Sequence, residues 1–341
     1  MVPEILQDFQ LKRFNTFGVS AKASEFVRIN SLEDLRVIRD YLSQTPEKPF
    51  MVLGGGSDVL FRQDFPGLIL LMEMRGITVV NEDTDYHYIR AGAGENWHSF
   101  VRRMLDAGKT GLENLALIPG TVGASPIQNI GAYGIEVAER IVSVECFDMQ
   151  SGEVVEFSAE QCEFGYRSSI FKKPENHKYV IISVLFKLPK NWIPLLDYGD
   201  LKREIDSYRP PRLNVEDVFA SVVALRSRKL PNPQRIGNAG SFFKNPILSR
   251  EKFREILRIA PDVVSYPVDE DRVKLSAAWL IDKAGLKGLR MGNVGTYERQ
   301  PLVIVNYGQA CGEEVYAMAQ DICLHVKNYF GIKLEPEVVI I

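Results

Sequence analysis

The N-terminal part of the chain alternates amphipathic helical patterns with short apolar runs. Ser31-Leu-Glu-Asp34 resembles a helix capping box, and apolar residues then recur at helical spacing over 32–42. The apolar run 49–53 predicts a strand that leads into the triple-glycine turn 54–56, which gives a strand–helix–strand opening. A second helical pattern runs over 97–105 and stops at a glycine.

Strand patterns dominate the middle of the chain. β-Branched and aromatic residues concentrate in runs that predict strands at 141–147, 154–157 and 179–186. Proline-rich stretches at 208–212 and 230–234 then bracket an expected domain boundary. Beyond it, the spacing predicts helices at 250–260, 276–284 and 313–330, and a final strand at 334–341.

The segment from Ile118 to Gly134 is the most informative part of the chain. Its glycines and Pro126 exclude a helix, and its small side chains allow a ligand to approach the backbone closely. Backbone amides exposed in this way hold diphosphates. A buried structural turn is the alternative interpretation. A second such turn, Gly54-Gly-Gly-Ser-Asp58, favours the ligand and predicts that it is large, extended and phosphate-bearing.

Composition limits the partners of this chain of 341 residues. Its 41 basic and 44 acidic residues give a net charge of −3, so no broad nucleic-acid-binding surface is expected. The start lacks the pattern of a signal peptide, and the longest apolar runs fall short of the ~20 residues of a membrane span. We therefore expect a cytoplasmic protein without membrane contact. The 4 cysteines and 4 histidines lack metal-site spacing, so we expect buried thiols and no metal.

The glycine-rich turns do not match the common nucleotide fingerprints. Gly92-Ala-Gly94 lacks the third glycine of a dinucleotide motif, since Trp97 stands there, and the turn at 54–56 fails likewise at Val59. Gly108-Lys-Thr110 resembles the end of a P-loop, but Arg103 occupies the position of the first glycine. The ligand is therefore not expected in a Rossmann domain.

Further local clusters carry polar groups that a packed core does not need. Arg167 lies in the aromatic frame 164–171, and Ser241 lies among small and aromatic residues in 237–245. Glu335 and Glu337 are two apart on the predicted final strand, so both face one side. Taken singly, each cluster has a structural alternative: a salt bridge for the arginine, a turn cap for the serine and a solvated strand face for the glutamates.

Together these clusters resemble the UDP-N-acetylenolpyruvoylglucosamine reductase family. The resemblance covers nearly the whole chain, in order, through Asn15–Gly18, 54–60, Gly92–Trp97, Gly111–Gly134, 164–171, Tyr198–Asp200, 237–246, Val273–Asp282 and Leu334–Val338. It implies an α+β fold: an FAD-binding fold of the vanillyl-alcohol-oxidase type in two subdomains, plus a C-terminal α+β substrate-binding domain. The expected divisions are 1–72 joined by the strand 332–341, then 73–212, then 213–331.

The resemblance also implies the reaction. Family members use NADPH and noncovalent FAD to reduce the enolpyruvyl ether of UDP-N-acetylglucosamine to UDP-N-acetylmuramate, a precursor of peptidoglycan. We therefore expect FAD as cofactor, NADPH as co-substrate, a small UDP-sugar substrate and a monomer. NADPH and the substrate would use the same flavin face in turn, which implies ping-pong kinetics.

The family's catalytic positions fall on Arg167, Ser241 and Glu337. Arg167 would stabilise the enolate, a protonated Glu337 could donate to the same oxygens, and Ser241 would give the proton to carbon. The cofactor contacts fall mostly on the two glycine-rich turns: Gly54, Gly55, Gly56, Ser57, Asp58, Pro119, Gly120, Gly123, Ala124, Ser125, Ile127, Asn129, Gly131, Gly134 and Arg226. The substrate and nicotinamide contacts fall on Tyr133, Tyr166, Tyr198, Lys229, Asn245, Tyr266, Lys274, Lys287 and Gln300.

Tyr198 resembles the tyrosine of the subtype whose loop covers the nucleotide, but the chain departs from the family pattern at two other places. Ser57-Asp58 stands where many relatives have Ser-Asn, and Glu337-Val-Val-Ile-Ile341 lacks the usual Arg and Gly. Two other functions remain open. An FAD-linked oxidase would consume oxygen with an alcohol, and a UDP-sugar-binding protein without flavin would be colourless.

Overall fold

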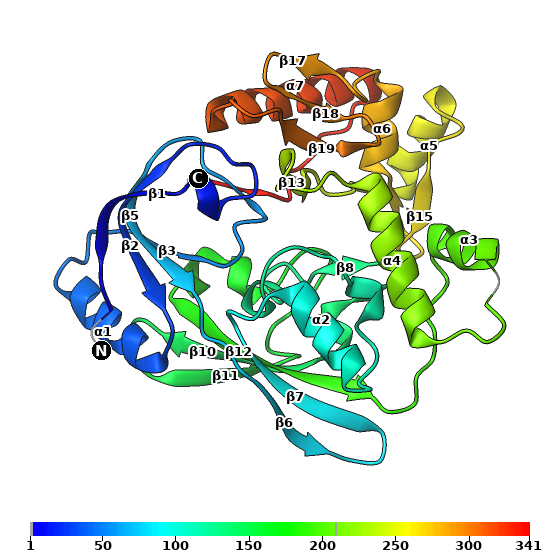
Figure 1. Ribbon diagram of the computed structural model, residues 1–341. Helices are drawn as coiled ribbons and strands as arrows, with labels where there is room; N and C mark the ends of the chain where they lie inside the picture. Colours follow the sequence, from blue (N-terminus) through cyan, green and yellow to red (C-terminus); the bar gives the residue numbers. More distant parts are fainter. Residues whose placement is uncertain (1–2, 209) are drawn as a thin grey trace. The chain divides into compact units, whose positions relative to one another are not determined.

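The chain forms two compact units in a computed structural model that describes residues 3–208 and 210–341 (Figure 1). Unit 1 comprises Met1–Phe9, Ala23–Gly55 and Pro66–Arg226, and unit 2 comprises Gln10–Lys22, Gly56–Phe65 and Ser227–Ile341. The triple-glycine turn therefore lies where the chain passes from one unit to the other, since the boundary falls between Gly55 and Gly56.

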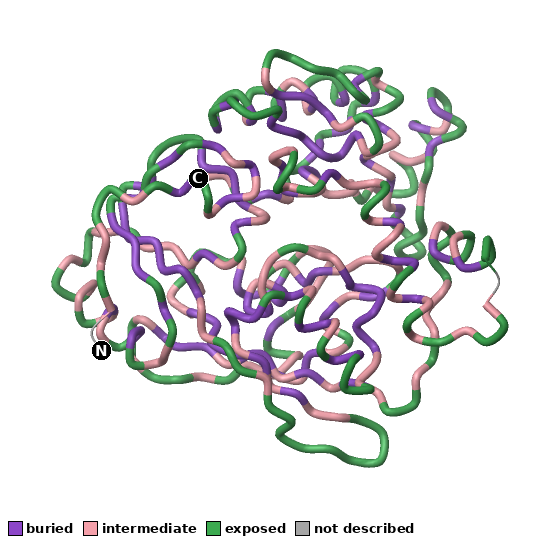
Figure 2. Tube along the Cα trace, in the orientation of Figure 1, coloured by how far each residue is buried: buried purple, intermediate pink, exposed green. Residues whose placement is uncertain are grey.

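Unit 1 contains a four-stranded and a five-stranded sheet. The four-stranded sheet has the order β1-β2-β5-β3, with β1 at Leu6–Gln10, β2 at Lys22–Ile29, β5 at Phe65–Met72 and β3 at Phe50–Leu53. The five-stranded sheet is antiparallel, with the order β11 (Val154–Ser158), β10 (Ile141–Asp148), β12 (Tyr179–Pro189), β7 (Tyr86–Gly92) and β6 (Ile77–Glu82). Buried residues, purple in Figure 2, concentrate in the inner strands β2 and β5 of the first sheet and β10 and β12 of the second, while the edge strands β1, β6 and β11 have none.

The first helices of unit 1 confirm their sequence signals. α1 (Leu32–Ser43) begins at the Ser31 capping box, which Asp34 completes, and α2 (Trp97–Asp106) begins at the Asn96 side chain. The inner face of α2 is apolar and packs in the core, where the rings of Phe100 and Phe186 lie 5.1 Å apart. α3 (Gly199–Tyr208) and α4 (Val215–Lys229) were not predicted, because they lie among the proline-rich stretches.

Unit 2 contains three small sheets and three helices. The first sheet has the order β13 (Gly237–Ser241), β19 (Gln300–Asn306), β18 (Val294–Tyr297) and β17 (Arg290–Met291). The second has the order β14 (Ile247–Ser249), β16 (Arg272–Leu275) and β15 (Ser265–Pro267). The third consists of β20 (Val339–Ile340) and β4 (Val59–Leu60). The helices α5 (Arg250–Ile259), α6 (Ala277–Lys283) and α7 (Gly312–Phe330) confirm the predicted ones, and Gly331 ends α7 in the left-handed conformation.

The predicted final strand is longer than the observed one. Only Val339–Ile340 forms a strand, because its partner β4 is equally short, and residue 336 makes an isolated bridge to Phe243. Short elements complete the description: strands β8 (Gly131–Ala132) and β9 (Ile135–Glu136), and 3₁₀ turns at Lys12–Phe14, Glu113–Leu115, Val122–Ala124, Val137–Glu139, Ile170–Lys172 and Pro174–Asn176. No helix in the described ranges is long and apolar enough to cross a membrane.

Candidate functional site

The two glycine-rich turns lie against each other in unit 1. A β-carbon on Gly54 would come within 2.7 Å of Oγ1 of Thr121, and one on Gly55 would come within 2.9 Å of Cα of Gly120. Both distances are too short for a side chain, so this approach of the two backbones requires glycine. The fold thus brings together the turns that the sequence singled out separately.

The amides of the two turns are used differently. In the longer segment, the amides of residues 122–125 already donate to the carbonyls of Glu95, Ala93, Thr121 and Val122. The prediction that this segment exposes a run of amides is therefore wrong for 122–125, which fold into a 3₁₀ turn. By contrast, the amides of Gly55, Gly56 and Ser57 donate to no acceptor among the described residues. The short turn is thus the better amide donor for a phosphate.

Several non-glycine residues around these turns adopt the left-handed backbone conformation. Leu117, Asn129, Tyr133 and Arg167 have φ values of 58°, 47°, 48° and 52°. Such residues are strained, and they concentrate at functional sites when the surrounding structure holds them in place. Asn129, Tyr133 and Arg167 are predicted site residues, whereas Leu117 is not.

Asn129 and Arg167 are held by a common network. The Asn129 amide group donates to the Glu136 carboxylate at 2.7 Å and to the Gly165 carbonyl at 3.1 Å. Arg167 lies in the turn of a tight hairpin in which the Gly165 and Ser168 backbones pair. Its Nη2 donates to the Gly131 carbonyl at 2.8 Å, which ties the guanidinium to the glycine-rich segment.

Arg226, at the C-terminal end of α4, brings a second guanidinium to the same unit. Its Nε donates to the Leu117 carbonyl at 3.3 Å. Burial of the group lowers the pKa of Arg226, the phenol of Tyr133 partly offsets this, and the positive charge of Arg167 adds to it. No carboxylate in the described part of the chain pairs with Arg226. Such a cation favours an anionic ligand.

Trp97 and His98 hold the start of the longer turn in place, and neither is among the predicted site residues. The Trp97 indole donates to the Leu115 carbonyl at 2.9 Å, and its backbone amide donates to the Gly120 carbonyl at 3.1 Å. The Leu117 amide donates to Nδ1 of His98 at 3.0 Å. The only signal in the sequence is that these residues begin α2 just after Gly92-Ala-Gly94.

Ser241 and Glu337 lie close together in unit 2. β13 pairs with β19 through a bulge between Asn238 and Ser241, and such bulges re-aim side chains at active sites. The Glu337 amide donates to the Phe242 carbonyl at 2.8 Å, next to Ser241. The alternative interpretation of Ser241 requires its hydroxyl to cap a turn. Within the described residues, this hydroxyl caps none.

The remaining predicted contacts are divided between the units. In unit 1, the Tyr133 and Tyr198 rings meet edge to face at 5.2 Å, and the Arg167 guanidinium lies 5.3 Å from the Tyr166 ring centre. In unit 2, Tyr266 pairs with Lys274 in neighbouring strands. The other residues of this set in unit 2 are placed separately. The side-chain oxygen Oδ1 of Asn245 accepts from the Ala277 amide at the start of α6, and Lys287 donates to Asp282. Gln300 begins β19, and Lys229 ends α4.

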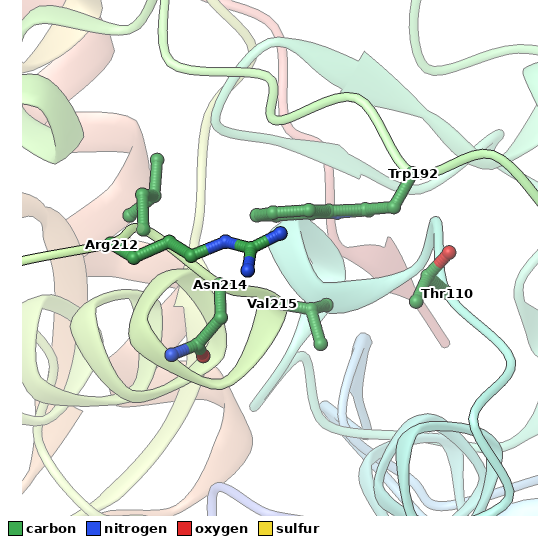
Figure 3. A pocket seen from close by; sticks show the side chains of 6 residues that line it. Thr110, Trp192, Arg212, Asn214 and Val215 are labelled. Atoms are coloured by element: carbon green, nitrogen blue, oxygen red, sulfur yellow. The ribbon is translucent and has the colours of Figure 1, made fainter.

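A hollow of about 490 Å³ lies elsewhere in unit 1 (Figure 3). It is lined by Thr110, Trp192, Arg212, Leu213, Asn214 and Val215. Figure 3 shows the Arg212 guanidinium next to the Trp192 ring, whose indole donates to Glu113 at 2.7 Å. None of the predicted site residues lines this hollow, so it is separate from the candidate site. No group of metal-ligating side chains converges within the described ranges.

Comparison with known proteins defines the class of this chain. Residues 23–158 match the family model described as "FAD binding domain". The chain also shares its fold with p-cresol methylhydroxylase, with a TM-score of 0.50 and 12% identity over 94% of this chain and 82% of that one. The chain therefore has an FAD-binding fold of the vanillyl-alcohol-oxidase type with an additional C-terminal domain.

The C-terminal domain and the similarity of the whole chain to curated relatives identify the family. Residues 232–341 match the model "UDP-N-acetylenolpyruvoylglucosamine reductase, C-terminal domain". The reductases of Burkholderia multivorans and Burkholderia mallei are 47% and 48% identical, each over 98% of this chain and 96% of the relative. The reductase structure from Thermus caldophilus has a TM-score of 0.67 and 26% identity, covering 100% of this chain and 99% of that one. The chain belongs to the UDP-N-acetylenolpyruvoylglucosamine reductase family.

Gly123 offers a test of whether the longer turn shapes the flavin site. A β-carbon on Gly123 would lie 2.5 Å from Cβ of Ala93, so Gly123→Ala must push the segment out of position. We expect purified Gly123→Ala protein to carry less FAD, and Ala93→Gly in the same chain to restore part of it by removing the clashing methyl group. Visible absorbance per polypeptide measures both. Full flavin in Gly123→Ala alone would contradict the prediction.

Proposed function

We propose that this protein reduces the enolpyruvyl ether of UDP-N-acetylglucosamine to UDP-N-acetylmuramate for peptidoglycan precursor synthesis, with FAD as cofactor and NADPH as co-substrate. The observation that carries this proposal is that the backbone holds each of the predicted catalytic residues in a defined position. Arg167 is held in a left-handed turn against the glycine-rich segment, and Ser241 follows a strand bulge beside Glu337.

The residues present fit a noncovalent FAD. The contact between Gly55 and Gly120 lets the two turns approach each other backbone to backbone, and the amides of residues 55–57 suit a diphosphate. Arg226 adds a buried positive charge without a described carboxylate partner. When bound and reduced, FAD supplies the hydride for the vinyl carbon of the substrate.

Arg167 would stabilise the charge that develops on the substrate carboxylate. Its Nη2 is anchored on the Gly131 carbonyl at 2.8 Å, which fixes the plane of the guanidinium before substrate arrives. A preorganised donor of this kind is worth ~10²–10³ in rate. Glu337, positioned through the Phe242 backbone, would in its protonated form donate to the same oxygens.

Ser241 would give the proton to the carbon next to the carboxylate. On one side of it, the Gly240 amide donates to Oδ1 of Asn238 at 3.0 Å, and on the other, the Phe242 amide donates to the Leu302 carbonyl at 2.8 Å, so the backbone is held on both sides of the serine. A fixed donor delivers the proton to one face of the carbon, as the formation of a single stereocentre requires. General-acid catalysis of this kind contributes roughly 10²–10⁴ in rate.

The other predicted contacts belong to the same proposal. Tyr198 would cover the nucleotide, while Lys229, Asn245 and Gln300 would bind the UDP-sugar. Tyr266, Lys274 and Lys287 would serve the substrate and nicotinamide region. We also propose a cytoplasmic monomer with two FAD-binding subdomains, 1–72 joined by the strand 332–341 and then 73–212, and with a substrate-binding domain at 213–331.

An absorption spectrum tests the function directly. We expect purified protein to be yellow, to lose its visible absorbance on anaerobic addition of NADPH, and to regain it when the enolpyruvyl UDP-sugar is added. Acid precipitation should release the colour, since the flavin is noncovalent. A colourless protein would reject the proposal, and reoxidation by oxygen with an alcohol but not by the UDP-sugar would favour an oxidase.

Arg167→Lys tests the charge-stabilising role. Lysine keeps the charge but loses the planar fork, so we expect slow flavin reoxidation by the enolpyruvyl substrate and near-normal reduction by NADPH. Glu337→Gln should impair the same half-reaction. Stopped-flow measurement of each half-reaction separates the effects. If only reduction by NADPH slowed, both residues would have to be reassigned.

Ser241→Ala tests proton donation against a role in folding. We expect normal reduction by NADPH, normal binding of the UDP-sugar, and reoxidation slower by roughly 10² or more. Ser241→Cys should recover part of the rate, since a thiol can also donate a proton. The melting temperature of Ser241→Ala should stay near that of the wild type. A stable Ser241→Ala enzyme with wild-type reoxidation would remove Ser241 from the mechanism.

A further inference from the structure

The N-terminus of α2 makes consecutive contacts with the segment that leads into the longer glycine-rich turn. As described above, Trp97 donates to the carbonyls of Leu115 and Gly120. Leu117 lies between these two residues in the sequence, and its amide donates to Nδ1 of His98 at 3.0 Å. A backbone amide can only donate, so Nδ1 of His98 acts as an acceptor here and carries no proton. The neutral imidazole is therefore part of the observed geometry.

Leu117 forms hydrogen bonds to both His98 and Arg226, and so links these two side chains. Its amide donates to His98, and its carbonyl accepts from Nε of Arg226 at 3.3 Å. Leu117 has φ of 58°, a left-handed conformation that a leucine rarely adopts without external support. The hydrogen bond to His98 supplies such support, and it thereby fixes the direction in which the Leu117 carbonyl points.

The direction of that carbonyl matters because of the shape of the guanidinium. A bond at Nε leaves the two terminal nitrogens on the far side of the planar group, where they form a fork for an anionic ligand. We infer that neutral His98 is a positioning residue, which holds Leu117 so that its carbonyl aims the Arg226 fork at the FAD-binding region. This inference rests on the proposed function, in which Arg226 contacts the cofactor.

The surroundings of His98 oppose its protonation. Its ring stacks on Phe219 of α4, with ring centres 5.7 Å apart. The charged groups that face it are Arg102 and Arg226, and Arg102 is paired with Asp106 and Glu216. Burial first, then the positive charges of Arg102 and Arg226, lower the pKa of His98 from its ordinary value of 6.5.

The lowered pKa sets the direction of a pH effect. An unfolded chain takes up this proton near pH 6.5, before the folded chain does, so the stability that neutral His98 contributes is complete above this value. It is lost as the pH falls toward the lowered pKa. There the imidazolium no longer accepts the Leu117 amide, and Arg226 loses its fixed direction.

Two substitutions separate the hydrogen bond from the packing. His98→Phe keeps a ring for Phe219 but has no acceptor, whereas His98→Asn places an acceptor oxygen where Nδ1 stood and cannot be protonated. The exposed His177 lies in the same unit, so His177→Phe is the matched control. Flavin fluorescence measures FAD release from each holoenzyme across a pH series, and amide hydrogen exchange reports on Leu117 independently of flavin.

We expect His98→Phe to increase FAD release roughly tenfold near neutral pH, as for one lost hydrogen bond, and to expose the Leu117 amide to exchange. The difference from the wild type should shrink as the pH falls, because the wild type then loses the same hydrogen bond. His98→Asn should restore both near neutral pH and should lack the acid-dependent release of the wild type. Equal release from His98→Phe and wild type near neutral pH, or equal impairment in both variants, would overturn the inference. A colourless wild type would reject the flavin function, while Leu117 protection that follows the acceptor would still support the positioning by His98.

Discussion

The approach of two glycine backbones is the constraint on which the candidate site depends. Gly55 and Gly120 come so close that a β-carbon on the first would lie 2.9 Å from Cα of the second. Any side chain there would separate the turns by the size of a methyl group, and the segment that follows Gly120 would move with them. Arg167 is tied to that segment through Gly131, so its position also depends on this contact.

The strained backbone around the turns is held by interactions that the rest of unit 1 provides. A left-handed non-glycine residue costs roughly 1–2 kcal/mol. Asn129 offsets this cost with side-chain bonds to Glu136, Gly165 and the Ala138 amide, and Leu117 does so through its bond with His98. These partners come from different elements, so the left-handed conformation of Leu117 depends on the fold, while at Asn129 the fold adds to the tolerance that asparagine itself has for this conformation.

This dependence explains what the sequence could predict. Capping residues and helical spacing are local, and they located α1, α2 and the last three helices. The sequence did not predict the α4 helix, because the nearby Pro210 and Pro211 indicate a loop. The internal bonds of the 122–125 amides involve Glu95 and Ala93, which no local pattern connects to that turn. His98 could not be recognised for the same reason, because its role depends on Leu117 and Arg226.

The two departures from the family pattern, Asp58 and the C-terminal residues 338–341, lie beside each other in unit 2. The Val339 amide donates to the Asp58 carbonyl at 3.0 Å, and β20 then pairs with β4 directly after Asp58. These are backbone contacts, which depend little on the side chains at 338–341. Glu337 is held on one side by this pairing and on the other by its amide bond to Phe242 at 2.8 Å. Loss of the usual Arg and Gly after Glu337 therefore leaves the position of this carboxylate determined by the backbone.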